Sequence, residues 1–182
     1  MRGDDFLRHF EKTLGSSVVY DGKIIKVLRD EVLLENGAES VREVVRHKGA
    51  VAVLAVDGDG SVYFVRQFRY PVGRELLEVP AGKLEAGENP LECAKRELFE
   101  ECGVAAESWT ELGPIYTSPG FCDEVIWLFF AKELSPVGQR LDEDEFLDVV
   151  KMPFAEVLQK AEAGAFTDGK TQLILLRCKD KI

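Results

Sequence analysis

The chain has 182 residues and a formal net charge of −10, with 46% hydrophobic and 31% charged residues, a balance typical of one compact globular domain with a sizeable core. No apolar run approaches the ~18 residues of a membrane span, and the acidic balance argues against sequence-independent binding to nucleic acid, which requires a basic face. The first residues lack the apolar stretch of a signal peptide and the cysteines form no CxxC pair, so we expect a cytoplasmic protein with reduced thiols.

The first part of the chain predicts a small β appendage. A helical start precedes alternating apolar and polar segments in VVYDGKIIKVLRDEVLLENG, where the Asp21-Gly22 pair indicates a hairpin turn. The pattern changes at Gly49, so we expect an appendage over residues 1–48 and a main domain over residues 49–182.

Short strands separated by turns follow Gly49. The segments that predict them are AVAVLAV, SVYFVRQFRY and ELLEVPAGK, and the turn residues 57–60 separate the first two. These strands lead directly into an acid-rich segment, residues 82–104.

The acid-rich segment predicts a well-framed helix from Pro90 to about Cys102. Asn89 can cap its start, proline is favoured at the first helical position, Glu92 can complete a capping box, and Gly103 can end the helix.

Helical spacing assigns different faces to the apolar and acidic residues of this helix. The packing face comprises Leu91, Ala94, Leu98 and Cys102, and the acidic arc comprises Glu97, Glu100 and Glu101. Carboxylates at this spacing repel one another by a few tenths of a kcal/mol per pair, which a hard divalent cation such as magnesium would offset. A solvated acidic face is the alternative, and Arg96 beside Glu97 weighs against it.

Beyond the acid-rich segment the pattern predicts two more strands and two helices. The strands are EVIWLFFAKEL and EFLDVVKMP, and the helices are FAEVLQKAEAGA and TQLILLRCK. We therefore expect an α+β fold with a mixed sheet flanked by helices.

The acid-rich segment resembles the Nudix box. The matching pattern is Gly82, five residues, Glu88, seven residues, then Arg96-Glu97-Leu98-Phe99-Glu100-Glu101-Cys102-Gly103-Val104. The resemblance implies the Nudix fold, a mixed β-sheet sandwiched between helices, and hydrolysis of a nucleoside diphosphate linked to another group. It also implies magnesium, with manganese as a substitute, held by Glu97, Glu101, Glu100 and the carbonyl of Ala81, with Arg96 orienting the glutamates.

The flanking segments resemble the ADP-ribose pyrophosphatases of this family. They are REVVRHKGAVAVLAV, VRQFRYPVGRELLEVPAG and TSPG, with Pro119 fifteen positions after Val104. The resemblance implies a homodimer whose appendage helps to form the partner's site, and a nucleoside diphosphate sugar as ligand. It further implies that Arg69, Glu78, Arg46 and the Gly120 segment bind the substrate.

Relatives of this subfamily take the base that activates water from a loop after the box. The loop LDEDEF offers four carboxylates, Asp142, Glu143, Asp144 and Glu145, and Glu145 matches best by its position before a strand. The resemblance therefore implies Glu145, Glu100 and Arg96 as the catalytic set, with AMP and ribose 5-phosphate as products. A solvated acidic turn is the alternative for any single member of the loop.

Other functions share the same box. A GDP-mannose-type sugar-nucleotide pyrophosphatase would use the same metal helix, because specificity lies in the shape of the pocket. A non-catalytic ADP-ribose-binding regulatory domain would usually have a degraded box and a DNA-binding extension. Cleansing of oxidised nucleoside triphosphates and RNA decapping fit the appendage and the acidic charge less well.

Overall fold

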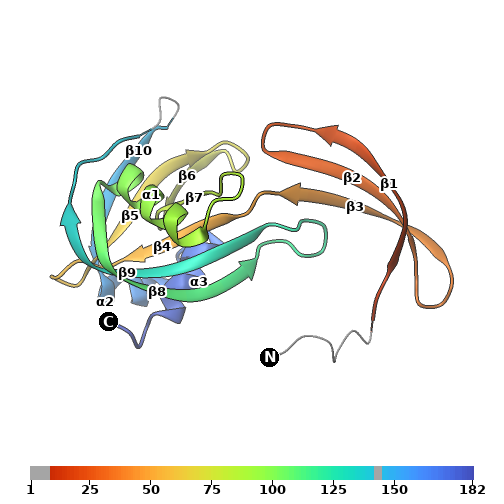
Figure 1. Ribbon diagram of the computed structural model, residues 1–182. Helices are drawn as coiled ribbons and strands as arrows, with labels where there is room; N and C mark the ends of the chain where they lie inside the picture. Colours follow the sequence, from red (N-terminus) through yellow and green to blue (C-terminus); the bar gives the residue numbers. More distant parts are fainter. Residues whose placement is uncertain (1–8, 142–144) are drawn as a thin grey trace. The chain divides into compact units, whose positions relative to one another are not determined.

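The computed structural model describes residues 9–141 and 145–182 (Figure 1). The chain separates into two compact units. The first contains the described residues up to Lys48 together with Tyr116–Glu124, and the second contains Gly49–Ile115 and Val125–Ile182.

The first unit contains a three-stranded antiparallel sheet in the order β1-β2-β3, formed by Lys12–Asp21, Ile25–Leu33 and Glu39–His47. The backbone N–H of Gly22 donates to the carbonyl of Ile25 at 3.0 Å, which confirms the predicted hairpin turn. The predicted helical start lies largely outside the described residues. Its described part is not helical, because residues 9–11 lead directly into β1.

The second unit contains two sheets. The first has the order β7-β4-β9-β8 and is mixed, because β4 runs parallel to β9 and antiparallel to β7. Its strands are Ala81–Lys83, Ala50–Ala55, Val125–Pro136 and Val104–Tyr116. The second sheet is antiparallel in the order β10-β5-β6, formed by Leu147–Pro153, Ser61–Arg69 and Arg74–Glu78.

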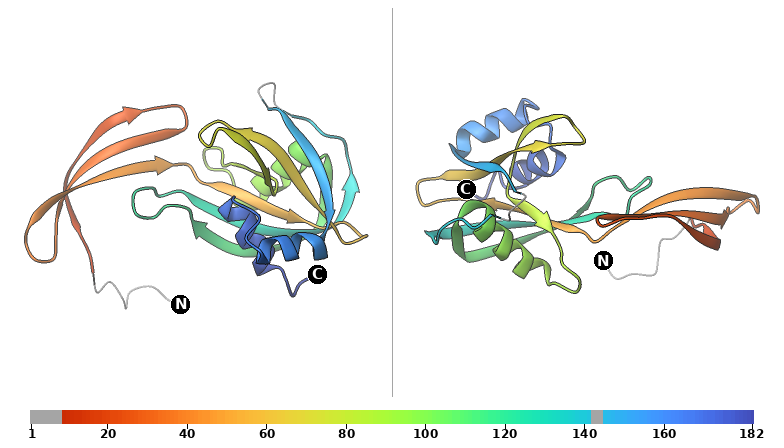
Figure 2. Two further views of the ribbon diagram at one scale, coloured as in Figure 1. Left: turned by 180° about the vertical axis from the view of Figure 1, so that it is seen from behind. Right: turned by 90° about the horizontal axis from the view of Figure 1, so that it is seen from above.

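Three helices cover the sheets of the second unit on opposite sides (Figure 2). They are α1 (Pro90–Cys102), α2 (Phe154–Glu162) and α3 (Gly169–Arg177), and each corresponds to a predicted helix. Helix α1 lies on one side, and α2 and α3 lie on the other. The predicted arrangement of a mixed sheet between helices is confirmed.

Strand β4 explains how the two sides are joined. All of its residues are buried, as expected for an apolar run between two layers. Alternate side chains point to opposite faces of a strand. Ala50, Ala52 and Leu54 therefore pack in the core of α2 and α3, and Val51, Val53 and Ala55 pack in the core of α1.

The ends of α1 follow the predicted signals with one exception. The side chain of Asn89 accepts from the backbone N–H of Leu91 at 2.9 Å, and Gly103 ends the helix in a left-handed conformation with φ 67°. The capping-box prediction for Glu92 was wrong, because this carboxylate pairs with Lys95 one turn later, at 2.8 Å.

Candidate active site

Two of the three glutamates of the predicted acidic arc are buried. The exposed fraction is 7% for Glu97 and 3% for Glu101. The expectation that the arc is separate from the packing faces was therefore wrong for this pair. Residues four apart lie on the same side of a helix, and this side faces β7, whose Ala81 N–H donates to Oε2 of Glu101 at 2.9 Å.

Gly82 provides the space for the carboxylate of Glu97. A Cβ atom at position 82 would lie 1.8 Å from Cδ of Glu97, well inside van der Waals contact. A larger residue at this position would displace the Glu97 carboxylate, because strand and side chain approach closely here. The glycine at the first position of the predicted box thus leaves room on β7 for a side chain of α1.

Arg96 joins the carboxylates around α1. Its Nε and Nη2 donate to the two oxygens of Glu88 at 3.0 and 3.1 Å, and its Nη1 donates to Glu97 at 2.7 Å and to Glu100 at 3.0 Å. The hydrogen bonds with Arg96 lower the pKa of Glu88 to about 2. Arg96 therefore orients three glutamates, which is the arrangement that the resemblance implies for it.

The carboxylates of this group carry more charge than Arg96 neutralises. Burial, together with the negative charges of Glu97 and Glu145, raises the pKa of Glu101 to about 8. Burial likewise raises the pKa of Glu97, and Glu100 and Glu145 add to the effect. A bound cation would relieve this repulsion.

The donors of this group fit a hard divalent cation. Glu97, Glu100 and Glu101 supply carboxylate oxygens from adjacent turns of one helix, and such oxygens are the ligands that magnesium prefers. In the parts of the chain that the structure describes, no three acidic, histidine or cysteine side chains already converge as a metal-binding group. Arg96 instead bonds both Glu97 and Glu100.

Gln139 and Arg140 are attached to the end of α1. The side-chain nitrogen of Gln139 donates to the carbonyl of Glu101 at 2.7 Å, and the N–H of Arg140 donates to the carbonyl of Glu100 at 3.1 Å. These bonds satisfy carbonyls that a helix end leaves without an intrahelical partner. Glu145 raises the pKa of Glu97 and Glu101, so its charge acts on the glutamates of α1. The other predicted members of this loop, Asp142 to Asp144, lie outside the described residues.

Arg69 and Glu78 form a bidentate pair between β5 and β6. Nε and Nη2 of Arg69 donate to the two oxygens of Glu78, both at 2.8 Å. Glu78 is only 1% exposed. Burial alone would raise its pKa, but hydrogen bonds and charges from Arg69 and Lys170 lower it below the ordinary value. The structure thus brings together two residues that were predicted separately.

Sequence reasoning missed two charged residues that lie next to the Arg69–Glu78 pair. Lys170 and Asp168 stand at the start of α3, where Nζ of Lys170 bonds Glu78 and also lies 3.0 Å from Oδ2 of Asp168. Asp168 caps α3 by accepting from the N–H of Thr171 at 3.0 Å. An aspartate just before an apolar periodic segment is a recognisable N-cap signal, and it would have placed this helix end.

Arg46 and Gly120 belong to the first unit. Nη1 of Arg46 lies 3.0 Å from Oδ2 of Asp123, and the other oxygen of Asp123 accepts from the N–H of His47 at 2.8 Å. Gly120 lies in a turn in which the N–H of Cys122 donates to the carbonyl of Ser118 at 2.9 Å. A Cβ at Gly120 would meet nothing within 4 Å, so packing alone does not require this glycine.

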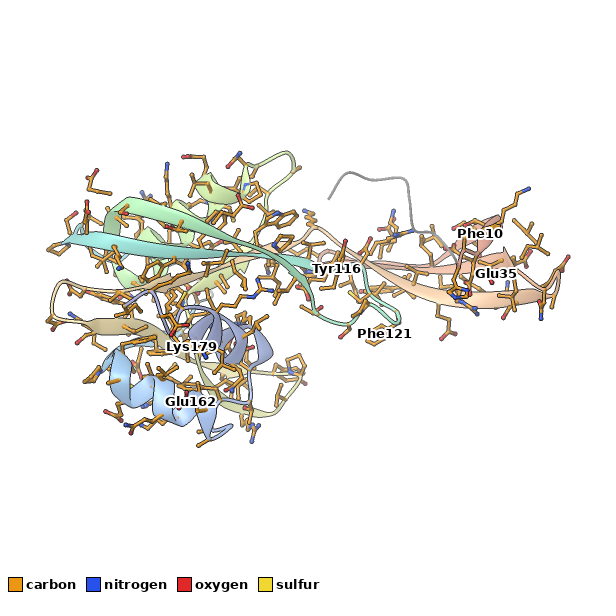
Figure 3. All side chains as sticks on the ribbon, turned by 90° about the horizontal axis from the view of Figure 1, so that it is seen from below. Phe10, Glu35, Tyr116, Phe121, Glu162 and Lys179 are labelled. Atoms are coloured by element: carbon orange, nitrogen blue, oxygen red, sulfur yellow. The ribbon has the colours of Figure 1, made fainter. Side chains whose placement is uncertain are left out.

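Some aromatic side chains are packed and others are accessible. Trp109 donates to the carbonyl of Ala106 at 2.9 Å and meets Phe129 edge-on, and Trp127 packs against the same core. Tyr20 and Phe121 are 56% and 59% exposed, so their rings are available to contact a ligand. Figure 3 shows Tyr116 at the end of β8 and Phe121 on the segment that connects β8 to β9.

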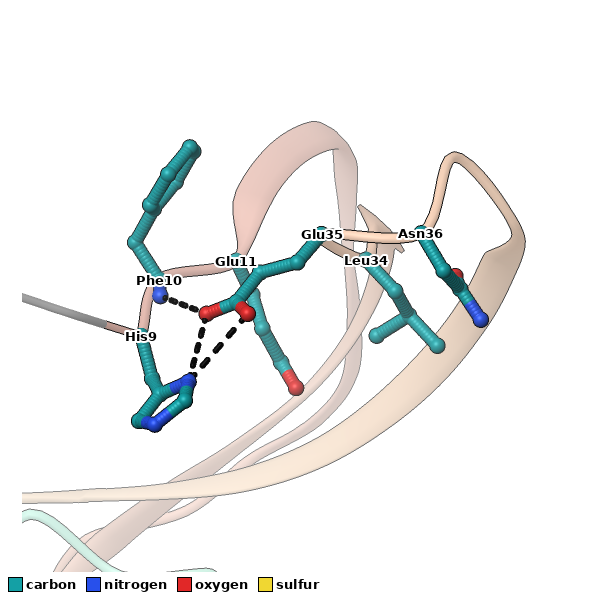
Figure 4. Close-up of a pocket in the computed structure, with 6 residues that line it drawn as sticks. All are labelled: His9, Phe10, Glu11, Leu34, Glu35 and Asn36. Carbon is teal, nitrogen blue, oxygen red and sulfur yellow. Dashed lines mark hydrogen bonds and ion pairs between the residues drawn. The ribbon is translucent and has the colours of Figure 1, made fainter.

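Two surface hollows contain none of the predicted site residues. One of about 560 Å³ lies in the first unit (Figure 4), where His9 and the N–H of Phe10 both bond the carboxylate of Glu35. The other, of about 470 Å³, lies beside the start of α1 and is lined by Asn89, Pro90, Leu91, Trp109, Glu111, Trp127 and Phe129. The carboxylate clusters are therefore the better candidates for chemistry.

None of the described helices is long and apolar enough to cross a membrane.

Comparisons with known proteins cover nearly the whole chain. Residues 46–172 match the NUDIX domain, and residues 11–45 match the nucleoside diphosphate sugar hydrolase N-terminal domain. An ADP-ribose pyrophosphatase of Bacillus subtilis is 45% identical and a methanol dehydrogenase activator of Bacillus methanolicus 44% identical, each over 88% of both chains. A GDP-mannose pyrophosphatase of Yersinia enterocolitica is 35% identical over 80% of this chain and 82% of its own.

The fold is also similar to that of a solved structure. The crystal structure of an ADP compounds hydrolase aligns with a TM-score of 0.83 over 98% of this chain and 96% of that chain, at 24% identity.

Proposed function

Because this chain belongs to the Nudix family of hydrolases, we propose that it hydrolyses the diphosphate bond of ADP-ribose to give AMP and ribose 5-phosphate. The glutamate cluster of α1, with more negative charge than Arg96 neutralises, is the observation that carries the proposal. The 45% identical relative named ADP-ribose pyrophosphatase supports the choice of substrate.

Magnesium is the proposed cofactor, with manganese as a substitute. Glu97, Glu100, Glu101 and the carbonyl of Ala81 would hold it, since hard oxygen donors suit this ion. When bound, the metal would neutralise diphosphate charge and lower the pKa of a coordinated water. The Cβ-free backbone at Gly82 keeps Glu97 next to β7, and Arg96 holds Glu97 and Glu100.

Glu145 is the proposed base. Its carboxylate would accept a proton from the water whose oxygen attacks one phosphorus, while the bond from that phosphorus to the bridging oxygen breaks. The negative charge of Glu145 raises the pKa of Glu97 and Glu101, which supports a position beside the proposed metal ligands. Hydrogen bonds to the carbonyls of Glu101 and Glu100 keep Gln139 and Arg140 at the end of α1.

Arg69, Glu78, Arg46 and the Gly120 segment are the proposed substrate-binding residues. A guanidinium presents a rigid fork of donors that suits diphosphate oxygens. Nε and Nη2 of Arg69 bond Glu78, and its side chain remains 37% exposed, so the guanidinium is both oriented and accessible. We propose that Glu78 acts mainly by holding Arg69.

A homodimer is also proposed, with residues 1–48 as the appendage that contacts the partner. The first unit exposes apolar side chains that a partner could cover, namely Leu14, Val18, Val19 and Tyr20 on β1 and Ile24 in the turn before β2. Sedimentation equilibrium of the chain and of a Val18→Lys variant tests this. A monomeric mass for the unmodified chain at micromolar concentration would contradict it.

GDP-mannose is the second candidate substrate, favoured by the 35% identical GDP-mannose pyrophosphatase. The α1 cluster would serve either reaction, because both substrates are cleaved at a diphosphate. A non-catalytic ADP-ribose-binding domain is less well supported, since each glutamate of the box is present and oriented.

Product analysis separates these functions. The chain is incubated with ADP-ribose or GDP-mannose and magnesium, and release of AMP or GMP is measured by chromatography, with Glu97→Gln as the inactive control. AMP release that requires both magnesium and Glu97 supports the proposal. Cleavage of GDP-mannose alone would replace it, and binding of ADP-ribose without any cleavage would favour the regulatory domain.

A further inference from the structure

The start of α3 is joined to the end of β6 by buried charges. Glu78 is 1% exposed, and its Oε2 accepts from Nη2 of Arg69 and also from Nζ of Lys170. The side chain of Lys170 is only 11% exposed and lies 3.0 Å from Asp168. A buried carboxylate is stable only when cations and hydrogen bonds compensate it, and here Arg69 of β5 and Lys170 of α3 do so.

Lys170 is held in place from the backbone. Asp168 accepts from the N–H of Thr171 at 3.0 Å and from its hydroxyl at 2.6 Å. The same hydroxyl accepts from the N–H of Val79 at 2.9 Å, and Thr171 is fully buried. Because Val79 directly follows Glu78, the start of α3 is attached to the strand that carries the carboxylate. These bonds therefore hold the backbone that carries Lys170 beside Glu78.

The consequence falls on Arg69. Its Nε and Nη2 are used by Glu78, whereas its Nη1 bonds no side chain in the described parts of the chain. Lys170 occupies one flank of Oε2, which limits the positions that the guanidinium can take on Glu78. The Lys170 contact thus restricts the direction in which the free edge of Arg69 points.

We propose that Lys170 is a positioning residue, which fixes Glu78 and through it sets Arg69 to receive the diphosphate of the substrate. The proposal deepens the proposed function and rests on it. Within the described residues its ion pairs are with Glu78 and Asp168 and not with the α1 glutamates, so we assign Lys170 to substrate binding and not to the chemical step. Its loss should weaken substrate binding and leave the turnover of bound substrate nearly intact.

Steady-state kinetics with ADP-ribose and magnesium test the proposal. Lys170→Gln keeps a donor but removes the charge, and a lost charge-assisted bond corresponds to roughly a tenfold rise in KM, with kcat changed by less than about twofold. Lys170→Arg keeps the charge on a larger group, so we expect an intermediate rise of about threefold. The matched control is Lys160→Gln, which removes an exposed lysine paired with Glu156 on α2 and should change neither constant.

A double-mutant cycle distinguishes positioning from a general structural role. If Lys170 acts through Arg69, the pair Arg69→Lys and Lys170→Gln should raise KM no further than Arg69→Lys alone. Thermal unfolding of each variant shows whether the fold is retained. An unchanged KM in both Lys170 variants would overturn the proposal, as would full additivity with Arg69→Lys. Absence of ADP-ribose cleavage by the unmodified chain would instead remove the proposed function itself.

Discussion

Arg96 and Arg69 each hold buried or half-buried carboxylates in the second unit, but the charge around them differs. Arg96 alone bonds three glutamates, which all come from the box segment. Arg69 bonds a single glutamate, which it shares with Lys170, and Lys170 also pairs with Asp168. The first cluster has excess negative charge, whereas cations and anions are equal in number in the second.

The difference indicates a division of function between the clusters. Excess carboxylate charge on one helix suits a divalent cation, and a balanced cluster suits the fixed presentation of one guanidinium to an anion. Substitutions in the Arg96 cluster should therefore lower kcat, and substitutions in the Arg69 cluster should raise KM. Four changes test the Arg96 side of this comparison.

The largest effect is expected from Glu101→Gln. The amide oxygen can still accept from the N–H of Ala81, but the ligand charge is lost, and we expect kcat to fall by about a thousandfold, as for removal of a principal electrostatic group. Turnover under magnesium and thermal unfolding are measured together. A folded variant with nearly normal turnover would contradict the assignment of the metal cluster.

Gly82→Ala should damage both stability and activity. The added methyl group would overlap the carboxylate of Glu97. Because this carboxylate is the end of a flexible side chain that can shift, we expect a loss of about 1 kcal/mol, at the low end for overpacking. Urea unfolding gives the loss of stability, and kcat reports the displaced ligand. Gly58→Ala is the matched control, because a Cβ at that position meets nothing within 4 Å. Equal stability and equal kcat in the two variants would show that the Glu97 carboxylate moves aside without an energetic penalty.

Glu88→Gln should change how stability depends on pH. Arg96 lowers the folded pKa of Glu88 from 4.5 to about 2. The charged form is thus stabilised by folding, and this contribution is present above pH about 4.5 and is lost as the pH falls toward 2. The difference in unfolding free energy between the unmodified chain and the variant should be constant near neutrality and shrink in that window. A difference that is independent of pH would exclude the ion pair as its cause.

The smallest effect is expected from Asn89→Ala. Loss of the cap to Leu91 should cost about 1 kcal/mol of stability. Asn89 stands at the opposite end of α1 from Glu100 and Glu101, so kcat and KM should stay unchanged at temperatures where the variant is folded. A fall in kcat comparable to that of Gly82→Ala would mean that catalysis depends on the stability of the whole helix.

Local patterns predicted the secondary structure well where caps and periodicity agree. Helix α1 has the predicted start at Pro90 and end at Cys102, because proline and glycine act on their own backbone. Strand β8 was missed, since the Gly113-Pro114 pair within it indicates a turn and its side chains are mostly half-buried. Its existence depends on pairing within the sheet.

The site was predictable only as far as it is local. The box pattern identified the glutamates of α1, but helical angles give relative directions and do not show which face meets a strand, so the burial of Glu97 and Glu101 was missed. Lys170 bonds Glu78 across a separation of 92 residues. No periodicity connects such distant positions, and only the packing of α3 beside β6 brings them together.

Strand β4 makes the two sides of the second unit depend on each other. Its successive residues alternate between the core of α1 and the core of α2 and α3. If either helical layer detached, one face of this apolar strand would be exposed to water. The strand would then lose packing that also holds it in place for the other core. The two layers should therefore unfold as one cooperative unit. The amide protons of β4 should then exchange with solvent only through global opening, so α1, the helix that carries the proposed metal ligands, shares the full stability of the unit.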